Sequence, residues 1–241
     1  MIKFEHTEVF NLEGAIRGMR NPKNSWDKSD SCWCHDTDYD CDECPTLDNC
    51  PIGATPYSSG YVIGENDMKL MQTLIKAGSE HRKFMRQIFV SVDITAPLFW
   101  WKEFDTYKVG TVRNSCSTMH KIHVKEFVYD DFTHEGIDEC NLVATFKNYL
   151  TTLEYLRTKF NETKEKKYWR ALIEMLPDGF NMKATITLDY ENLLGMCSKN
   201  QRRFHKLNEW SGIDYNVDNF ISWARTLPYS QELIFIDELQ N

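Results

Sequence analysis

Polar side chains that could bind an anion or a heteroaromatic ring follow an aromatic segment near the middle of the chain. The segment begins at Pro97 and includes Trp100, Trp101 and Phe104, and proline is favoured at the first position of a helix. Hydroxyls and amides donate and accept hydrogen bonds, and a cation can contact a phosphate. We therefore predict the active-site segment here, with the candidates Lys108, Thr111, Asn114, Ser117 and Thr118.

Cysteines crowd into one acidic segment of the chain. Five of the eight cysteines are Cys32, Cys34, Cys41, Cys44 and Cys50. Without an evident secretion signal, such crowding indicates thiols or a metal more than disulfides. These thiolates, with His35 nearby, would suffice for a tetrahedral zinc site. The alternative is a solvated loop, since the spacing fits no zinc module that we can name.

Composition limits the classes of partner. The chain has 241 residues and a net charge of −8, so a nucleic acid polymer or a membrane surface is not an expected partner. No apolar run approaches the length of a membrane span, and the first residues lack the apolar core of a signal peptide. We expect a cytoplasmic protein with one domain over residues 1–241 and a cysteine-rich acidic insertion at about 25–60.

The remaining elements are predicted from hydrophobic periodicity and from capping residues. A strand or turn that leads into a loop is predicted over residues 1–24, and a short extended piece over His120–Phe127. Further strands are predicted over Phe84–Ile94 and Lys183–Leu188. Helices are predicted over these ranges: Asn66–Ala77, from Pro97, Leu142–Phe160, Lys167–Met175, Asn192–Asn208 and Val217–Thr226.

The order of these elements and several motifs resemble the flavin-dependent thymidylate synthases. That family carries the signature Pro-Ile-Phe-Val-x-x-Gln-Trp-x-Arg-His-Arg-x-x-Ser-x-Asn-Glu-x-Ser-x-Arg-Tyr, whose opening matches Pro97-Leu98-Phe99. Counting without gaps places Glu103 at the Gln, Thr106-Tyr107-Lys108 at Arg-His-Arg and Thr111 at the first Ser. One inserted residue aligns the later positions, which are Asn114, Ser117, Met119 and His120.

Motifs on both sides of this signature extend the resemblance over roughly residues 60–228. The upstream His-x-Ser/Thr-Pro-Phe-Glu-His motif aligns with His81, Lys83 and Arg86. Downstream, Asp189-Tyr190-Glu191-Asn192-Leu193 lies where the family has Asn-Ala-Arg-Ser-Leu. The segment that begins at His205 resembles His-Ala-Gln-x-Glu.

The resemblance implies an α/β (α+β) fold with a central mixed or antiparallel sheet flanked by helices. It also implies reductive methylation of dUMP at C5, with FAD as the cofactor and with NADPH and methylene-tetrahydrofolate as co-substrates. The flavin would supply the redox chemistry. A pyrimidine deoxynucleoside monophosphate is the implied substrate, and a homotetramer is the implied assembly, because in the family loops from several subunits build each site.

The resemblance also assigns roles to individual residues. The implied contacts to the cofactor are His81, Lys83, Arg86, Tyr107, Lys108, Thr111, Asp189 and His205. The implied contacts to the substrate are Glu103, Asn114, Ser117, Thr118, Arg202 and Arg203. Taken singly, each cation has the alternative of ordinary surface charge, each histidine that of a structural residue, and the polar run that of a turn.

Departures from the family pattern leave other functions open. Thr106-Tyr107-Lys108 removes two cationic contacts, and Met119 replaces an arginine. One alternative is a related enzyme that modifies C5 of another pyrimidine nucleotide or adds another carbon group. The other is a catalytically silent protein that binds a nucleotide, a flavin or a metal.

Overall fold

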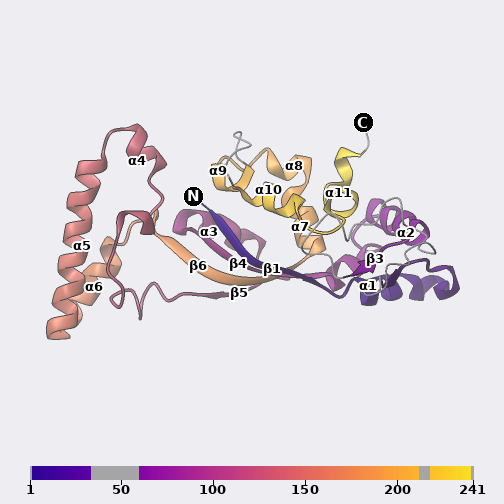
Figure 1. Ribbon diagram of the computed structural model, residues 1–241, viewed down its shortest axis with the longest axis horizontal. Helices are drawn as coiled ribbons and strands as arrows, with labels where there is room; N and C mark the ends of the chain where they lie inside the picture. The colour runs from indigo at the N-terminus through magenta and orange to yellow at the C-terminus, as the bar shows by residue number, and fades with distance from the viewer. Residues whose placement is uncertain (1, 34–59, 212–217, 240–241) are drawn as a thin grey trace, which may run out of the picture.

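The computed structural model describes residues 2–33, 60–211 and 218–239, and the fold is built around one antiparallel sheet (Figure 1). The order of its strands is β1-β4-β6-β5, and β2 and β3 form a separate pair. The strands are β1 Lys3–Phe10, β2 Cys32–Trp33, β3 Tyr61–Val62, β4 Phe89–Pro97, β5 Val112–Ser115 and β6 Asn181–Asp189. The antiparallel form of the predicted central sheet is thus confirmed.

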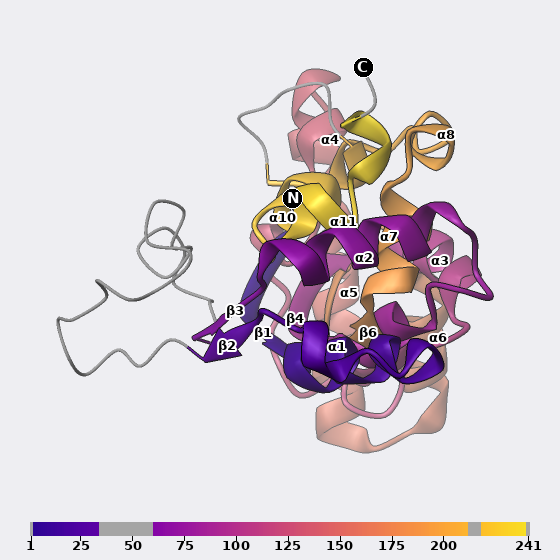
Figure 2. The same ribbon diagram turned by 90° about the vertical axis from the view of Figure 1, so that its right-hand side faces the viewer.

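Helices surround this sheet on one face and at both ends (Figures 1 and 2). The first four α-helices are α1 Leu12–Arg20, α2 Glu65–Lys76, α3 Leu98–Phe104 and α4 Glu135–Glu139. The others are α5 Val143–Thr163, α6 Lys166–Met175, α7 Tyr190–Cys197, α8 Lys199–Arg202, α9 Asn208–Ser211, α10 Phe220–Arg225 and α11 Ser230–Leu233. Short 3₁₀ turns are η1 Asn21–Lys23, η2 Trp26–Lys28, η6 Lys83–Gln87, η7 Asp105–Tyr107, η8 Tyr129–Asp131 and η9 Ile236–Glu238.

The alternation of the two central strands determines which face of the sheet is buried. Successive side chains of a strand point to opposite faces, and Val90, Val92 and Ile94 of β4 are fully buried, as is Ile186 of β6. Helices α3 and α7–α11 lie over one face of the sheet in Figure 1. The main core therefore forms between the sheet and these helices.

A helical hairpin, α5 and α6, extends from one end of the sheet and has a second apolar cluster of its own (Figure 1). Leu153 of α5 and Leu172 of α6 are fully buried in that cluster. Both helices lie where amphipathic periodicity predicts them, and so do α2 and β6. None of the helices in the described part of the chain has the length and apolar character of a bilayer crossing.

Three local predictions are wrong. Residues 83–87 form η6 and not the start of a strand, because β4 pairs with β1 only from Phe89, opposite Phe10. Turns and bends occupy 120–125 in place of the predicted extended piece, and the strand in this region is β5, whose residues are all exposed. The single helix predicted over Asn192–Asn208 is broken at Ser198, whose hydroxyl oxygen accepts from the N–H of Gln201 and caps α8.

Two helix starts also differ from the prediction. Residues 12–20, within the predicted strand or turn and loop, form α1, which buries Leu12, Ile16 and Met19. Pro97 is predicted as the first helical residue, but it ends β4 and is the N-cap of α3, which begins one residue later at Leu98. Its extended backbone turns the chain directly from strand into helix.

Candidate functional site

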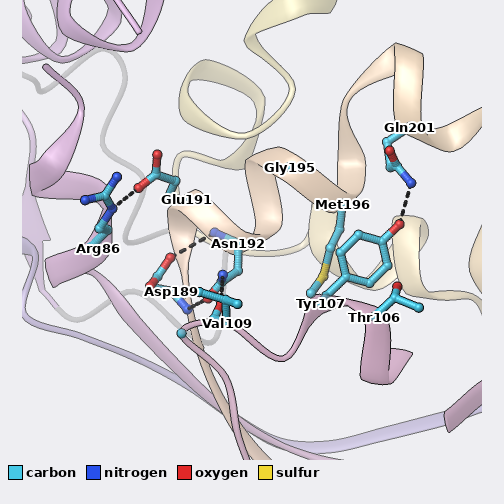
Figure 3. A pocket seen from close by; sticks show the side chains of 11 residues that line it. Arg86, Thr106, Tyr107, Val109, Asp189, Glu191, Asn192, Gly195, Met196 and Gln201 are labelled. Atoms are coloured by element: carbon cyan, nitrogen blue, oxygen red, sulfur yellow. Dashed lines mark hydrogen bonds and ion pairs between the residues drawn. The ribbon is translucent and has the colours of Figure 1, made fainter. Parts of the chain in front are cut away.

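A pocket of about 550 Å³ lies where η6, the end of β6, α7 and the segment after α3 meet (Figure 3). This volume falls within the range of about 300–1,000 Å³ that is typical of small-molecule sites. Its apolar surface comes mainly from Tyr107, Val109 and Met196. The polar lining residues are Arg86, Thr106, Asp189, Glu191, Asn192 and Gln201, and the two glycines are Gly110 and Gly195.

The floor of the pocket is a capped helix end. Asp189 ends β6 and accepts a hydrogen bond from the backbone N–H of Asn192 at 2.8 Å, while the Asn192 side chain accepts one from Asp189 N–H at 3.2 Å. Such a reciprocal cap fixes the start of a helix. The Asn192 amide also donates to the carbonyl of Val109 at 2.8 Å. Burial raises the pKa of Asp189 above its ordinary value.

Gly110 lets the loop after α3 approach this cap closely. Its φ is +83°, and a Cβ there would lie 3.1 Å from Asn192 and 3.3 Å from Asp189. Both the backbone conformation and the narrow space favour glycine. The sequence therefore brings the loop and α7 together at one edge of the pocket.

One rim of the pocket is an ion-pair cluster. Glu191 accepts hydrogen bonds from Arg86 and, at 2.9 Å, from Arg82. Burial alone would raise the pKa of Glu191, but the two guanidinium groups outweigh it and hold this pKa below its ordinary value. Arg86 thus faces the pocket with its charge balanced by Glu191.

Tyr107, which is part of the apolar wall, belongs to a hydrogen-bonded series that continues behind it. Its hydroxyl accepts from the amide of Gln201 at 2.6 Å (Figure 3) and lies 3.2 Å from Nε2 of His205. The other ring nitrogen of His205 lies 2.6 Å from Oε1 of Glu103. His205 is buried and stacks on Trp210, with ring centroids 4.3 Å apart. Burial is the main cause of the raised pKa of Tyr107.

The structure brings together some of the predicted cofactor contacts. Arg86, Tyr107 and Asp189 line the pocket, and His205 lies directly behind Tyr107. The others do not line it. His81 and Lys108 are exposed, Lys83 is exposed and pairs with Glu80 at 3.5 Å, and the Thr111 hydroxyl contacts the carbonyl of Tyr107 at 3.4 Å.

Most predicted substrate contacts lie apart from the pocket lining. Asn114 pairs with Thr185 at the edge strand β5, while Ser117 accepts a hydrogen bond from the His120 backbone at 2.8 Å in the following turn, which also contains Thr118. Their roles stay predictions.

The two arginines of the α8 region also have partners of their own. Arg202 pairs with Glu238 at 2.5 Å, and Arg225 pairs with the same carboxylate at 2.7 Å. These hydrogen bonds lower the pKa of Glu238 to about 2. Arg203 lies over the ring of Phe204 at 4.8 Å.

The zinc prediction falls mostly outside the described residues. Cys34, Cys41, Cys44 and Cys50 belong to the range 34–59, and Cys32 is exposed in β2. Within the described residues no group of three or more potential ligands lies close enough to hold a metal.

Sequence reasoning missed several pocket residues. Asn192 could have been found, since Asp189-x-x-Asn192 is the spacing of a reciprocal helix cap. Gln201 gave no such signal, because its contact with Tyr107 spans 94 positions. Glu191 aligned with a family arginine, and Arg86 with a family glutamate. At these two positions the charges are thus exchanged relative to the family motifs.

Comparison with known proteins supports the fold. No protein-family model and no curated protein matches the chain. Among solved structures, the flavin-dependent thymidylate synthase ThyX of Helicobacter pylori, complexed with FAD and dUMP, is similar over 98% of both chains, with a TM-score of 0.62 and 13% identity. A second structure with FAD and dUMP covers 100% of both, with a TM-score of 0.63 and 14% identity.

A third similar structure is the UMP/dUMP methylase PolB of Streptomyces cacaoi bound with 5-Br dUMP. It covers 98% of this chain and 95% of its own, with a TM-score of 0.56 and 11% identity. At such identities, the likeness establishes the fold alone. The chain is an α/β protein with the fold of the ThyX thymidylate synthases.

Proposed function

We propose that the chain is a flavin-dependent enzyme that reductively methylates dUMP at C5, with methylene-tetrahydrofolate as carbon donor and NADPH as reductant. The observation that supports this proposal is that residues from separate motifs meet at one pocket. Arg86, Tyr107, Asp189 and His205 come from four motifs that align with the family, and all four lie at one pocket or directly behind it. Motifs far apart in a sequence meet when they serve one site.

The pocket residues fit the ring system of a flavin. Tyr107, Val109 and Met196 offer an apolar surface for a flat ring, and a Cβ at Gly195 would meet nothing within 4 Å, so the space beside α7 is open. The amides of Asn192 and Gln201 are the hydrogen-bonding groups nearby. Arg86 is the pocket-lining cation suited to a phosphate. Its guanidinium would then contact both the phosphate and the Glu191 carboxylate.

When bound, FAD would supply the transfer of hydride that a C5 methylation requires. The residues of the chain would hold and orient the rings and keep water out of the apolar side of the pocket. Tyr107 would contact a ring with its face, since aromatic side chains stack well on heteroaromatic ligands. Assembly into a homotetramer is part of the proposal and follows from the resemblance.

A related activity on another pyrimidine nucleotide is the second candidate. It is favoured by Met119, which aligns with a family arginine and is half exposed. The similar enzyme PolB is named for action on both UMP and dUMP. Loss of a cationic contact would weaken selection of one nucleotide over another.

Spectroscopy of the purified protein tests the proposal first. A flavin absorbance spectrum, followed by oxidation of the reduced flavin on addition of methylene-tetrahydrofolate and dUMP, dCMP or UMP, would identify the substrate by its methylated product. Tetramer formation is measured by light scattering. Protein that binds neither FAD nor any of these nucleotides would exclude both enzymatic candidates and leave a silent binding protein.

A pair of glycine variants localises the site. Gly195→Leu should fill the pocket without a clash and reduce FAD and dUMP binding at least about tenfold, because its side chain would occupy ligand space. Gly136→Leu in α4 is the matched control, since its Cβ also meets nothing within 4 Å and it does not line the pocket. Equal binding by both variants would place the ligand elsewhere.

A further inference from the structure

Three ionisable side chains at the pocket are connected in a fixed order. Glu103 contacts one nitrogen of His205 at 2.6 Å, and the other nitrogen lies 3.2 Å from the Tyr107 hydroxyl. Glu103 comes from α3, Tyr107 from η7 and His205 from the segment after α8. Only Tyr107 of the three lines the pocket. The series therefore runs from a carboxylate outside the pocket to a phenol at its wall.

The chemistry of the three groups determines where the protons lie. An ionised carboxylate only accepts, so Nδ1 of His205 carries a proton and donates to Glu103. In the neutral imidazole with this tautomer Nε2 is an acceptor, and the Tyr107 hydroxyl donates to it. The amide of Gln201 donates to the phenol oxygen at 2.6 Å. A carboxylate that fixes the tautomer of an imidazole, which in turn accepts a hydroxyl proton, is the arrangement of a general base.

The surroundings keep this arrangement rigid. The side chain of His205 is 1% exposed and stacks on Trp210, so the ring has little freedom to turn. Glu103 is 31% exposed and is the member of the series that reaches solvent. Burial raises the pKa of Tyr107, which keeps it a phenol at neutral pH. Its proton leaves readily only if His205 accepts it.

We propose that Glu103, His205 and Tyr107 form a proton relay that removes the C5 proton of the pyrimidine, a role that rests on the proposed function. Replacing hydrogen by carbon at C5 must release one proton. In this step, after C5 has formed its bond to the new carbon, the C5–H bond breaks, its electron pair enters a π bond of the substrate, and the proton bonds to the Tyr107 oxygen. The phenolic proton moves to Nε2 of His205.

The charges balance within the relay. His205 becomes an imidazolium, and the Glu103 carboxylate beside it compensates the positive charge. Gln201 and the new Nε2–H both donate toward the phenol oxygen while it exchanges protons. The imidazolium later releases a proton to solvent at the exposed Glu103 end. No oxidant or reductant is needed for this step.

Nitrogen NMR on the ligand-free protein tests the relay independently of the reaction. In ¹⁵N-histidine-labelled protein we expect His205 as the tautomer with a protonated Nδ1, and we expect the Nε2 resonance to shift in Tyr107→Phe. Tyr149→Phe is the matched control, because its hydroxyl contacts the carbonyl of Met175 in the distant hairpin. A protonated Nε2 in neutral His205, or an Nε2 resonance indifferent to Tyr107→Phe, would overturn the relay.

Isotope exchange tests the catalytic step in the holoenzyme. With FAD bound, Tyr107→Phe should release deuterium from [5-²H]dUMP about 100-fold more slowly than the wild-type protein, the usual scale of general base catalysis. The rate of flavin reduction by NADPH and the Kd of dUMP should stay within about twofold, since phenylalanine keeps the ring. Glu103→Gln should slow deuterium release in the same direction.

The outcomes separate the relay from the proposed function. Deuterium release at the wild-type rate in Tyr107→Phe would overturn the relay, and so would a loss confined to flavin reduction. Wild-type protein that binds FAD and dUMP without forming a methylated product would overturn the proposed function instead. In that case the NMR result alone decides whether the hydrogen-bonded series exists.

Discussion

Within the described residues, two clusters each link a tyrosine, a histidine and a carboxylate, and they differ in order and in burial. At the pocket, His205 stands between Glu103 and Tyr107. Beside α4, Asp138 stands in the middle and accepts from Tyr129 at 2.6 Å, with Nδ1 of His134 at 2.7 Å. In this second cluster a further carboxylate, that of Asp130, lies 3.8 Å from His134. The two clusters thus contain the same kinds of chemical group, connected in a different order.

The order decides what each cluster can do. A central imidazole has two different nitrogens, so it can take a proton at one while giving one at the other. A central carboxylate only accepts, so the two neighbouring groups hold their protons against it. The His205 cluster can therefore relay a proton, while the Asp138 cluster stabilises the ionised carboxylate. Consistently, hydrogen bonds from Tyr129 and His134 lower the pKa of Asp138.

Burial separates the clusters further. The side chain of His205 is 1% exposed, and those of His134 and Asp138 are 31% and 46% exposed. Water can replace a lost partner at an exposed cluster but not at a buried one. The same substitution should therefore have unequal effects at the two places, and four predictions test this.

The largest effect is expected from His205→Ala. It removes a buried ring that stacks on Trp210 and leaves the Tyr107 hydroxyl without its acceptor. Cavity formation and the lost hydrogen bonds should lower the free energy of unfolding by about 3 kcal/mol. Urea denaturation followed by tryptophan fluorescence measures this change. A loss below about 1 kcal/mol would show that the buried cluster contributes no more than a surface one.

A smaller difference is expected between the two tyrosines. Tyr107→Phe leaves the Gln201 amide and Nε2 of His205 without the hydroxyl, and should cost about 1 kcal/mol of unfolding free energy. Tyr129→Phe should cost about 0.5 kcal/mol or less, since water can solvate Asp138. Parallel denaturation curves of the two variants check the order. Equal losses would contradict the role given to burial.

Local contacts leave a clearer signal in the sequence than distant ones. His134 and Asp138 are four positions apart, the spacing that brings side chains together on a helix, although we did not predict this pair. Periodicity did predict α5 and α6. The exposed strand β5 had no such signal, because tertiary pairing and not the local pattern decides it. The break at Ser198 had a local signal that we missed, since serine is a favoured helix N-cap and its hydroxyl accepts from the N–H of Gln201.

Site residues follow the same rule. His205 and Glu103 are 102 positions apart, and alignment with family motifs placed both at the site. The contact between these two residues depends on how α8 packs beside η7. The hydrogen bond from Gln201 to Tyr107 depends on the same packing. A single sequence gives no measure of that packing. The predictions for Asn114, Ser117 and Thr118 are equally untested, since they lie away from the pocket lining.

Asp138→Asn tests the contact between Asp138 and Tyr129 through the titration of this tyrosine. The hydrogen bond to Asp138 raises the pKa of Tyr129 from 10.0 to about 12. Because this pKa is raised in the folded state, the stabilisation is present below the unfolded value of 10.0 and is lost as pH rises through about 12. In Asp138→Asn the pKa of Tyr129 should fall toward about 10. Ultraviolet absorbance of tyrosinate measures it, with Tyr129→Phe as the assignment control, and an unchanged titration would refute the contact.

The smallest effect is expected from His134→Gln. The imidazole is partly exposed, and the Asp138 carboxylate keeps the Tyr129 hydroxyl and gains water when His134 is removed. Exposed pairs of this kind contribute little, so the free energy of unfolding should change by no more than about 0.5 kcal/mol. Denaturation at neutral pH, beside His205→Gln under the same conditions, measures both histidines with one replacement. If the free energy of unfolding fell equally in the two variants, burial would not distinguish the clusters. The order of the groups alone would then account for the difference between the cluster at the pocket and the one beside α4.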